Sequence, residues 1–298
     1  MARKGNKVDG WIIIDKDSGM TSADVVRRVK RIFHPQKIGH AGTLDPLATG
    51  ILPLALGEAT KTVSYITDAI KEYEFTIRWG EERTTDDSEG DIVKTSALRP
   101  NEKDIIKELP GFIGEIEQIP PQFSALKVDG QRAYKLARAG KPVELKPRMV
   151  KIDIFKPISG QNDKDYANFR VTCGKGTYIR SLARDLGRKL QCFGHITAIR
   201  RTIVGPFSKS GAFSLAKLDE LSHSARVLEA LIPIMTALDD IPALAITKDE
   251  AWRIKNGQLI RLPTKKSGTV CLTLDKTLVA LATVEDGETK PLRIFNLN

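Results

Sequence analysis

Asp45 is the carboxylate whose surroundings in the sequence most favour chemistry. It lies in the run GHAGTLDPLATG (residues 39–50), which contains three glycines, one proline and no other acidic residue. Pro46 has a fixed φ and biases the residue before it away from the helical region, while the glycines allow a close approach of backbone. We therefore expect a stiff corner that presents one carboxylate, either as a nucleophile or general base or as an ordinary turn residue that accepts backbone N–H groups.

Composition limits the class of protein. The chain has 298 residues, 41% of them hydrophobic, and 47 basic against 37 acidic side chains give a formal charge of +10, which favours a polyanionic partner. No stretch reaches the ~18 apolar residues of a membrane span, and the N-terminus lacks a signal-length apolar region. Three widely spaced cysteines do not form a disulfide framework, so we expect a cytoplasmic protein.

Two short segments resemble a phosphate-binding loop and a metal site, but neither has all the residues that such a site needs. Residues 174–177 (GKGT) contain a Gly-Lys pair, but Gly176 follows the lysine where a phosphate-binding P-loop needs Ser or Thr. Cys192 and His195 have a metal-like spacing without a second pair of ligands nearby, so we interpret them as ordinary core or loop residues. We expect no metal.

Hydrophobic periodicity predicts the elements that must position Asp45. We expect a strand over 11–16, a helix that begins at a capping box over 21–24, and a strand over 73–79. The basic face of that first helix is either solvated or in contact with phosphate. A second helix follows residues 174–177 with Thr177 as its cap, and it carries three arginines at i+4 spacing: Arg180, Arg184 and Arg188.

The pattern changes after Pro233. Alternating residues predict short strands over 269–274 and 278–284, joined onward by a turn at 286–287, which indicates a small β-barrel. We expect an α+β protein with a mixed, mainly antiparallel sheet over residues 1–235 and a small second domain over 236–298.

The run around Asp45, written G-H-x-G-T-L-D-P-x-A-x-G-x-L, resembles the catalytic loop of the TruB family of transfer-RNA pseudouridine synthases. Two other segments that resemble family motifs depart from them at one position each. In residues 15–22, Asp17 occupies the position where the family has proline, and in residues 198–202, Ile199 occupies the position where leucine is usual. The C-terminal residues 256–258 and 293–296 resemble a PUA domain, a small RNA-binding β-barrel. Four further segments resemble family motifs: residues 15–22 (DKDSGMTS), 71–73 (KEY), 174–182 (GKGTYIRSL) and 198–202 (AIRRT).

This resemblance implies a catalytic domain of the pseudouridine synthase type that isomerises uridine 55 in the T-arm of transfer RNA. Asp45 matches the essential aspartate, Arg180 matches the arginine that pairs with it, and Tyr73 matches the ring that stacks on the target base. Neither a metal nor an organic cofactor is implied. The enzyme is expected to act as a monomer without a protein partner.

The resemblance also implies which residues contact the RNA. His40 matches the residue that stacks in the disrupted T loop, Tyr178 lines the pocket, and Ile199 forms an apolar wall. Three lysines are expected to contact phosphates: Lys16, Lys61 and Lys127. Because the base must leave its stack, the protein is also expected to assist transfer-RNA folding.

Three alternatives remain open at this point. The chain could be a non-catalytic protein that binds or folds RNA on the same scaffold, although its Asp45, Tyr73 and Arg180 disfavour this. It could be a guide-RNA-dependent synthase that acts on ribosomal RNA, although it ends at Asn298 without the basic tail common in such proteins. A basic assembly factor would leave the run over 39–50 without a purpose.

Overall fold

The computed structural model divides the chain into two compact units. Unit 1 combines residues 1–45, 51–67 and 205–298, and unit 2 combines residues 46–50 and 68–204. Within the residues that the structure describes, no helix is both long and apolar enough to cross a membrane. The described residues are 5–124, 126–128, 130–141, 143–158 and 163–297.

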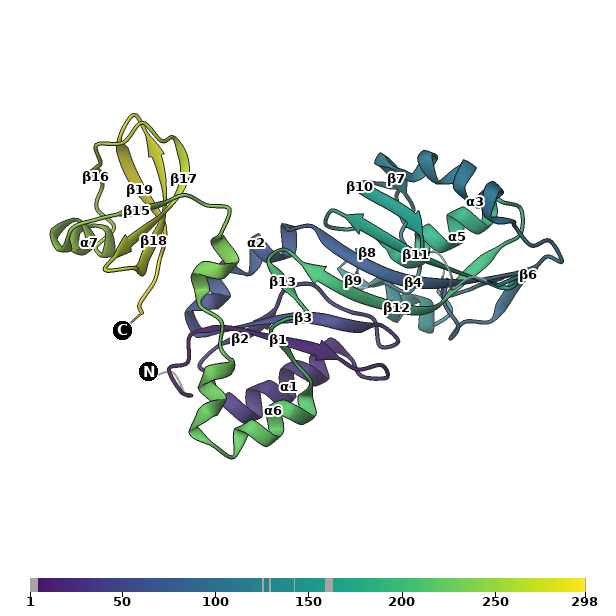
Figure 1. Ribbon diagram of the computed structural model, residues 1–298, viewed down its shortest axis with the longest axis horizontal. Coiled ribbons are helices and arrows are strands. Elements are labelled where there is room, and N and C mark those ends of the chain that lie inside the picture. Colours follow the sequence, from purple (N-terminus) through teal and green to yellow (C-terminus); the bar gives the residue numbers. More distant parts are fainter. Residues whose placement is uncertain (1–4, 125, 129, 142, 159–162, 298) are drawn as a thin grey trace. The chain divides into compact units, whose positions relative to one another are not determined.

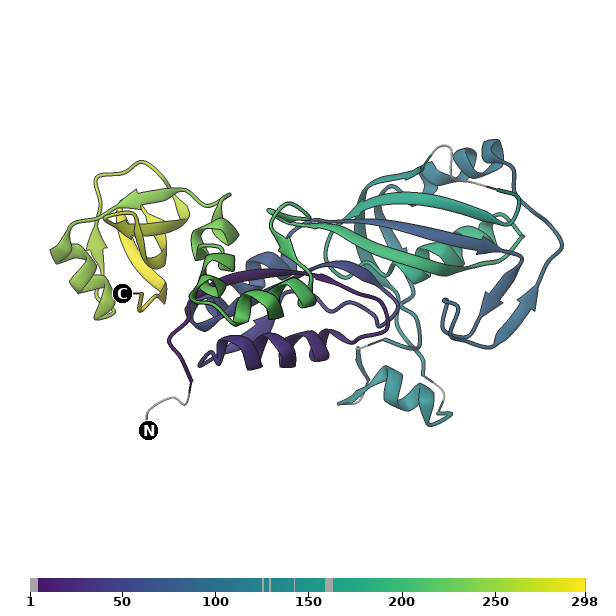
Figure 2. The ribbon, with the colours of Figure 1, turned by 60° about the horizontal axis from the view of Figure 1, so that its bottom comes forward.

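The first part of unit 1 is a set of strands with helices beside it (Figures 1 and 2). Strand β1 (Gly10–Lys16) pairs in parallel with β14 (Ala212–Phe213), and β2 (Ile38–His40) pairs antiparallel with β3 (Thr49–Leu56). Residues 11–14 of β1 are buried, as the apolar run predicts. The other elements are η1 (Gly57–Thr62), α2 (Val63–Asp68), β13 (Phe207–Ser208), α6 (Leu215–Ser222), η3 (Ala225–Ala230) and η4 (Ile234–Leu238).

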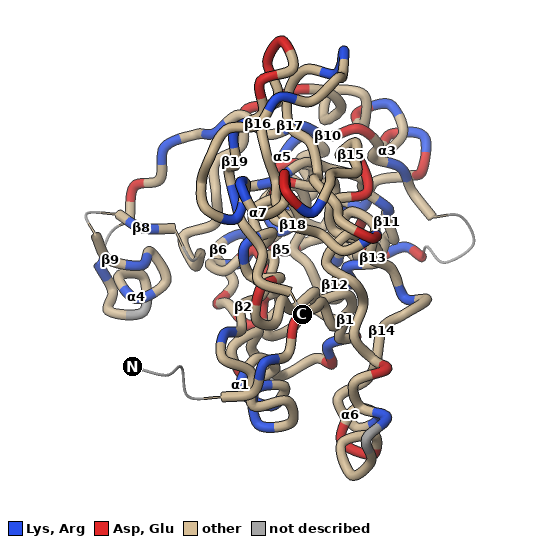
Figure 3. The backbone as a smooth tube through the Cα atoms, turned by 90° about the vertical axis from the view of Figure 1, so that its left-hand side faces the viewer, with Lys and Arg blue, Asp and Glu red and all other residues tan. Residues whose placement is uncertain are grey.

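Helix α1 (Ser22–Phe33) confirms the predicted capping box. The Thr21 hydroxyl accepts the Asp24 N–H, and the Asp24 carboxylate accepts the Thr21 N–H. Basic residues recur along α1, where the tube is blue in Figure 3. Arg27 pairs with Asp24 of the same helix, and Arg28 pairs with Asp219 of α6. The Arg28 guanidinium therefore helps to pack α1 against α6.

Unit 2 is built on an antiparallel sheet. Strand β4 (Lys71–Trp79) lies between β11 (Tyr166–Cys173) and β12 (Gly194–Val204), followed outward from β11 by β10 (Arg148–Pro157) and β7 (Gly114–Gln118). Helix α5 (Ile179–Lys189) lies against β12 and β4. The other elements are β5 (Glu81–Arg83), β6 (Ile92–Thr95), α3 (Glu102–Glu108), η2 (Leu109–Phe112), β8 (Lys127–Val128), β9 (Gln131–Arg132) and α4 (Ala133–Arg138).

A β-bulge changes one predicted alternation. The alternation of Val150, Ile152 and Ile154 in the sequence predicts that these side chains share one face of a strand, but the register of β10 against β11 shifts between Ile152 and Ile154. Ile154 is therefore 45% exposed, while Phe155 is 3% exposed and packs on Phe169. A bulge inserts one residue, so every side chain after it changes face.

The C-terminal sheet confirms the predicted strands and turn. Its order is β15–β17–β18–β19–β16, and it closes over a core that includes Ile254 of α7 (Lys248–Lys255). This curled sheet fits the expected PUA-like domain, and the α+β architecture with a mixed, mainly antiparallel sheet is confirmed. The domain boundary at residue 235 stays a prediction. The strands are β15 (Ala243–Ala245), β16 (Ile260–Arg261), β17 (Gly268–Leu274), β18 (Thr277–Glu285) and β19 (Glu288–Ile294).

Candidate active site

The backbone directly before Asp45 is fixed by one buried hydroxyl. Ser22 Oγ donates to the Leu44 carbonyl over 3.1 Å and accepts the Leu44 N–H over 2.9 Å. Leu44 is itself buried, whereas Asp45 is half-buried and Pro46 is exposed. The loop therefore holds Asp45 on a pinned backbone and leaves its side chain partly accessible. Sequence reasoning treated Ser22 only as part of the capping box, although it is the last residue of the family-like motif over 15–22.

The end of the same loop depends on Gly50. This residue has φ of +101°, and a Cβ there would lie 2.1 Å from the Arg201 carbonyl oxygen. Thr49 and Gly50 pair in parallel with Arg200 and Arg201 of β12. The close backbone approach that the glycines predicted is therefore present, and it fixes the loop at its C-terminal end.

Tyr73 lies on β4 opposite Val171 of β11 and Arg201 of β12. Its side chain is half-buried, whereas Phe75 and Ile77 further along the strand are buried. The strand predicted from alternation is confirmed, with a half-buried aromatic ring near its start. Arg201 is 1% exposed, so the residue paired with Tyr73 on β12 carries a buried guanidinium.

Lys71 begins the same strand and is buried. Burial, which removes the hydration of the charge, and the nearby Arg201 together lower the pKa of its ammonium to about 8. Its Nζ donates to the Ala69 carbonyl over 2.5 Å. Lys71 therefore loses its proton at a lower pH in the folded protein than an exposed lysine does.

Arg180 occupies the first turn of α5, and the start of this helix differs from the prediction. Tyr178, not Thr177, is the N-cap residue, and the Thr177 hydroxyl donates back to the Gly174 carbonyl. Gln118 replaces a capping side chain, because its amide accepts the Tyr178 N–H over 2.8 Å and donates to the Tyr178 carbonyl over 3.1 Å. A long-range glutamine, invisible to local capping rules, thus fixes the end of the helix that carries Arg180.

The Arg180 guanidinium is 4% exposed and lies among three oxygen atoms. Nη1 donates to the Thr85 carbonyl over 2.8 Å and lies 3.6 Å from Asp87 Oδ2, and Nη2 donates to the Phe123 carbonyl over 3.0 Å. Asp87 is a charged partner that the sequence does not reveal, since residues 86–90 read in isolation predict only a polar turn. The expected pairing with Asp45 stays a prediction, because the two residues belong to different units.

The lysines expected to contact phosphate occupy different environments. Lys16 is fully buried, and its Nζ donates to the carbonyls of Asp17 and Met20, so it shapes its own loop, and its contact with phosphate stays a prediction. Lys61 Nζ contacts the Glu58 carboxylate and the Ile294 carbonyl. Both ammonium groups are thus engaged within the protein.

The remaining RNA-contact candidates lie on strands or a loop. Lys127 is exposed on the β8–β9 hairpin, and His40 is half-buried at the end of β2. Tyr178 is half-buried before α5, and Ile199 of β12 is 8% exposed opposite Phe75. Their roles in RNA binding stay predictions.

Cys192 and His195 have backbone partners instead of a metal-like arrangement. Cys192 Sγ lies 3.8 Å from the Gly187 carbonyl, and His195 Nδ1 lies 3.1 Å from the Glu81 carbonyl. Among the described residues, no three His, Cys, Asp or Glu side chains are grouped so as to hold a metal ion.

Two solved structures share this fold over nearly the whole chain. The H/ACA RNP bound to a substrate RNA containing 2′-deoxyuridine matches with a TM-score of 0.74 and 25% identity, covering 97% of this chain and 85% of that chain. The archaeal box H/ACA sRNP Nop10–Cbf5 complex matches with a TM-score of 0.72 and 25% identity, covering 96% and 86%. The fold is that of the pseudouridine synthases.

Sequence comparison identifies the branch of this class. The model of the N-terminal domain of TruB family pseudouridylate synthase matches residues 30–179, and that of the tRNA pseudouridylate synthase B C-terminal domain matches residues 180–240. The chain is 50% identical to a Bradyrhizobium diazoefficiens protein named tRNA pseudouridine synthase B, covering 99% of this chain and 90% of the relative. A Caulobacter vibrioides protein of the same name is 49% identical, covering 99% and 98%. The chain belongs to the TruB family of pseudouridylate synthases and is an isomerase.

Proposed function

We propose that the protein isomerises uridine 55 in the T-arm of transfer RNA to pseudouridine. The observation that carries this proposal is the full-length similarity to relatives named tRNA pseudouridine synthase B, together with Asp45 on a pinned, partly accessible loop. The formal charge of +10 suits an RNA substrate. The protein acts in the cytoplasm as a monomer, without a guide RNA or a protein partner.

Asp45 is the essential catalyst in this proposal. The reaction breaks the C1′–N1 bond of uridine and forms a C1′–C5 bond, while N1 gains a proton and C5 loses one. No electrons are gained or lost, so one carboxylate that attacks the sugar or removes a proton from it suffices. Arg180 pairs with Asp45, and Tyr73 stacks on the uracil and assists loss of the C5 proton.

The remaining predicted contacts hold the extruded nucleotide and the RNA around it. His40 stacks in the opened T loop, Tyr178 lines the pocket and Ile199 supplies an apolar wall. Lys127 contacts phosphate from its exposed hairpin, and this hairpin position supports its role. Because extrusion opens the RNA elbow, the protein also assists transfer-RNA folding.

The test uses a T-arm hairpin with tritium at C5 of the target uridine and the purified protein alone. We expect release of tritium into water by the wild type and loss of that release in Asp45→Asn, with Asp104→Asn of the exposed α3 surface as the control. A hairpin with uridine only at another loop position should release none.

Two outcomes contradict the proposal. Release that survives Asp45→Asn removes the aspartate from the reaction, and release that requires added guide RNA favours the guide-dependent alternative. RNA remodelling by Asp45→Asn, followed with a fluorescent T-arm, separates the folding role from the isomerisation.

A further inference from the structure

Helix α5 is attached along its length to β5 and to the segment that follows it. Its three arginines, one turn apart, each reach an acidic side chain of residues 82–87. Arg188 contacts Glu82 through two hydrogen bonds of 2.7 and 2.9 Å, Arg184 lies 3.0 Å from Asp86, and Arg180 lies 3.6 Å from Asp87.

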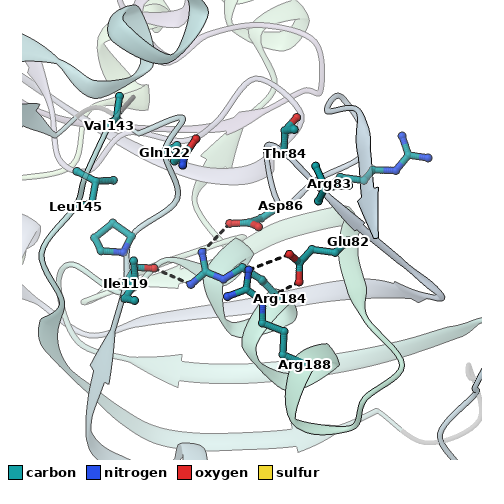
Figure 4. A pocket seen from close by; sticks show the side chains of 12 residues that line it. Glu82, Arg83, Thr84, Asp86, Ile119, Gln122, Val143, Leu145, Arg184 and Arg188 are labelled. Atoms are coloured by element: carbon teal, nitrogen blue, oxygen red, sulfur yellow. Dashed lines mark hydrogen bonds and ion pairs between the residues drawn. The ribbon is translucent and has the colours of Figure 1, made fainter. Parts of the chain in front are cut away.

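The Arg184–Asp86 ion pair is the buried middle member of this series. Its side chains are 8% and 7% exposed, and Figure 4 shows the Arg184 guanidinium between the Asp86 carboxylate and the Ile119 carbonyl. Arg184 also donates to Asp185 over 2.8 Å. The pair lines a cavity of about 310 Å³ whose apolar wall includes Val143 and Leu145.

The backbone at Asp86 explains how two consecutive carboxylates reach the same helix. Asp86 has φ of +61°, in the left-handed region that non-glycine residues rarely adopt. Its N–H donates to the Arg83 carbonyl, and its own carbonyl accepts the Ile196 N–H. With this turn, Asp86 reaches Arg184 and Asp87 reaches Arg180. A strained residue at this point is consistent with a functional constraint.

We propose that the Arg184–Asp86 ion pair is a positioning pair, which holds the turn over 85–87 so that Arg180 keeps the orientation needed for isomerisation. The inference rests on the proposed function, in which Arg180 pairs with the catalytic carboxylate. Thr85 and Asp87, the two residues of the turn that bind Arg180, lie on either side of Asp86. Any movement of Asp86 away from Arg184 therefore displaces both.

The charge state of Asp86 gives the pair a measurable signature. Burial raises the pKa of Asp86 to about 6, against the opposing effect of Arg184 and Arg180, while Asp185 raises it and Arg188 lowers it. Glu82 and Arg83 line the same cavity. The carboxylate is thus ionised at pH 7.5 and protonated at pH 5, where its ion pair with Arg184 is lost.

The same pKa determines how Asp86 affects stability. Between pH 3.8 and 6 the unfolded chain releases the Asp86 proton while the folded chain keeps it, so the free energy of unfolding falls as pH rises through this window. Asp86→Asn lacks this loss. The Tm of Asp86→Asn minus the Tm of the wild type should therefore increase between pH 4.5 and pH 7.5, although the variant is a poorer catalyst at pH 7.5.

The experiment measures kcat, KM and Tm on T-arm RNA for Asp86→Asn, Asp86→Glu and the control Lys189→Gln, which removes an exposed charge from the same helix. We expect kcat of Asp86→Asn to fall about tenfold at pH 7.5 with KM within about twofold, and Asp86→Glu to recover part of it. The wild-type rate should fall below pH 6, and this step should be absent in Asp86→Asn. An unchanged kcat, or a loss that follows a lower Tm and disappears on cooling, overturns the proposal.

A readout without turnover separates this proposal from the proposed function. The Arg180 Nη–H resonances in NMR spectra should be sharp and protected from exchange in the wild type at pH 7.5. They should broaden in Asp86→Asn and in the wild type at pH 5. Sharp resonances in all three samples overturn the positioning role, whereas a wild type that is inactive on T-arm RNA counts against the proposed function alone.

Discussion

Asp87 Oδ2 lies 3.6 Å from Arg180 Nη1, and both side chains are almost completely buried. A buried guanidinium is stable only where its charge and its N–H groups find partners. Arg180 meets this need with one carboxylate and two carbonyls, all from segments outside its own helix. Its orientation is therefore a property of unit 2 as a folded whole.

Asp87→Asn should reduce kcat at least about tenfold, since removal of one partner from a buried pair leaves the Arg180 charge without its compensation. KM should change less, because the RNA contacts proposed above involve other residues. Single-turnover tritium release measures the effect, with Glu89→Gln in the same turn as the exposed control. Equal rates for both variants would show that Asp87 has no part in holding Arg180.

Ser22→Ala should lower both stability and activity. The variant leaves the buried N–H and carbonyl of Leu44 without the hydroxyl that binds both, which costs about 2 kcal/mol of unfolding free energy. The loop before Asp45 then loses its anchor, so kcat should fall while the wild-type fold persists. Urea unfolding and tritium release test the two effects, with the exposed Ser210→Ala as control. A stable variant with normal kcat would refute the anchoring role.

Gly50→Ala and Gly39→Ala form a matched pair within one loop. A Cβ at Gly50 meets the Arg201 carbonyl at 2.1 Å on a backbone with φ of +101°, whereas a Cβ at Gly39 meets nothing within 4 Å. Gly50→Ala should lose about 3 kcal/mol or more of unfolding free energy, and Gly39→Ala should stay close to wild type. Thermal unfolding measures both, and similar Tm values would contradict the close approach at Gly50.

Local patterns were sufficient for much of the fold. The capping box at Thr21 and the strand that carries Tyr73 follow from side chains near in sequence, which is why they could be predicted. The start of α5 could not, because Gln118, sixty residues away, replaces the expected Thr177 cap. The family motifs predicted Asp45, Tyr73 and Arg180 as candidates. Asp86 and Asp87 escaped notice, since two acidic residues in a polar turn acquire their partners only when α5 packs beside them.

Lys71 provides a test of burial through pH. Its folded pKa of about 8 lies below the ordinary value of 10.5, so between these values the unfolded chain binds more protons than the folded chain. The free energy of unfolding of the wild type should therefore rise with pH from 8 toward 10.5, relative to Lys71→Met, which cannot titrate at this position. At pH 7 both states of the wild type are charged, and the variant avoids the cost of burying that charge.

The measurement is urea unfolding of both proteins at pH 7.5 and pH 10. We expect the stability of the wild type minus that of Lys71→Met to become more positive by about 2 kcal/mol or more across this range, given about 1.4 kcal/mol per pH unit. The comparison of wild type with Lys127→Met, which removes an exposed lysine, should not change with pH. A difference for Lys71→Met that stays constant would mean that its ammonium reaches water in the folded protein, and that the start of β4 is more open than its burial indicates.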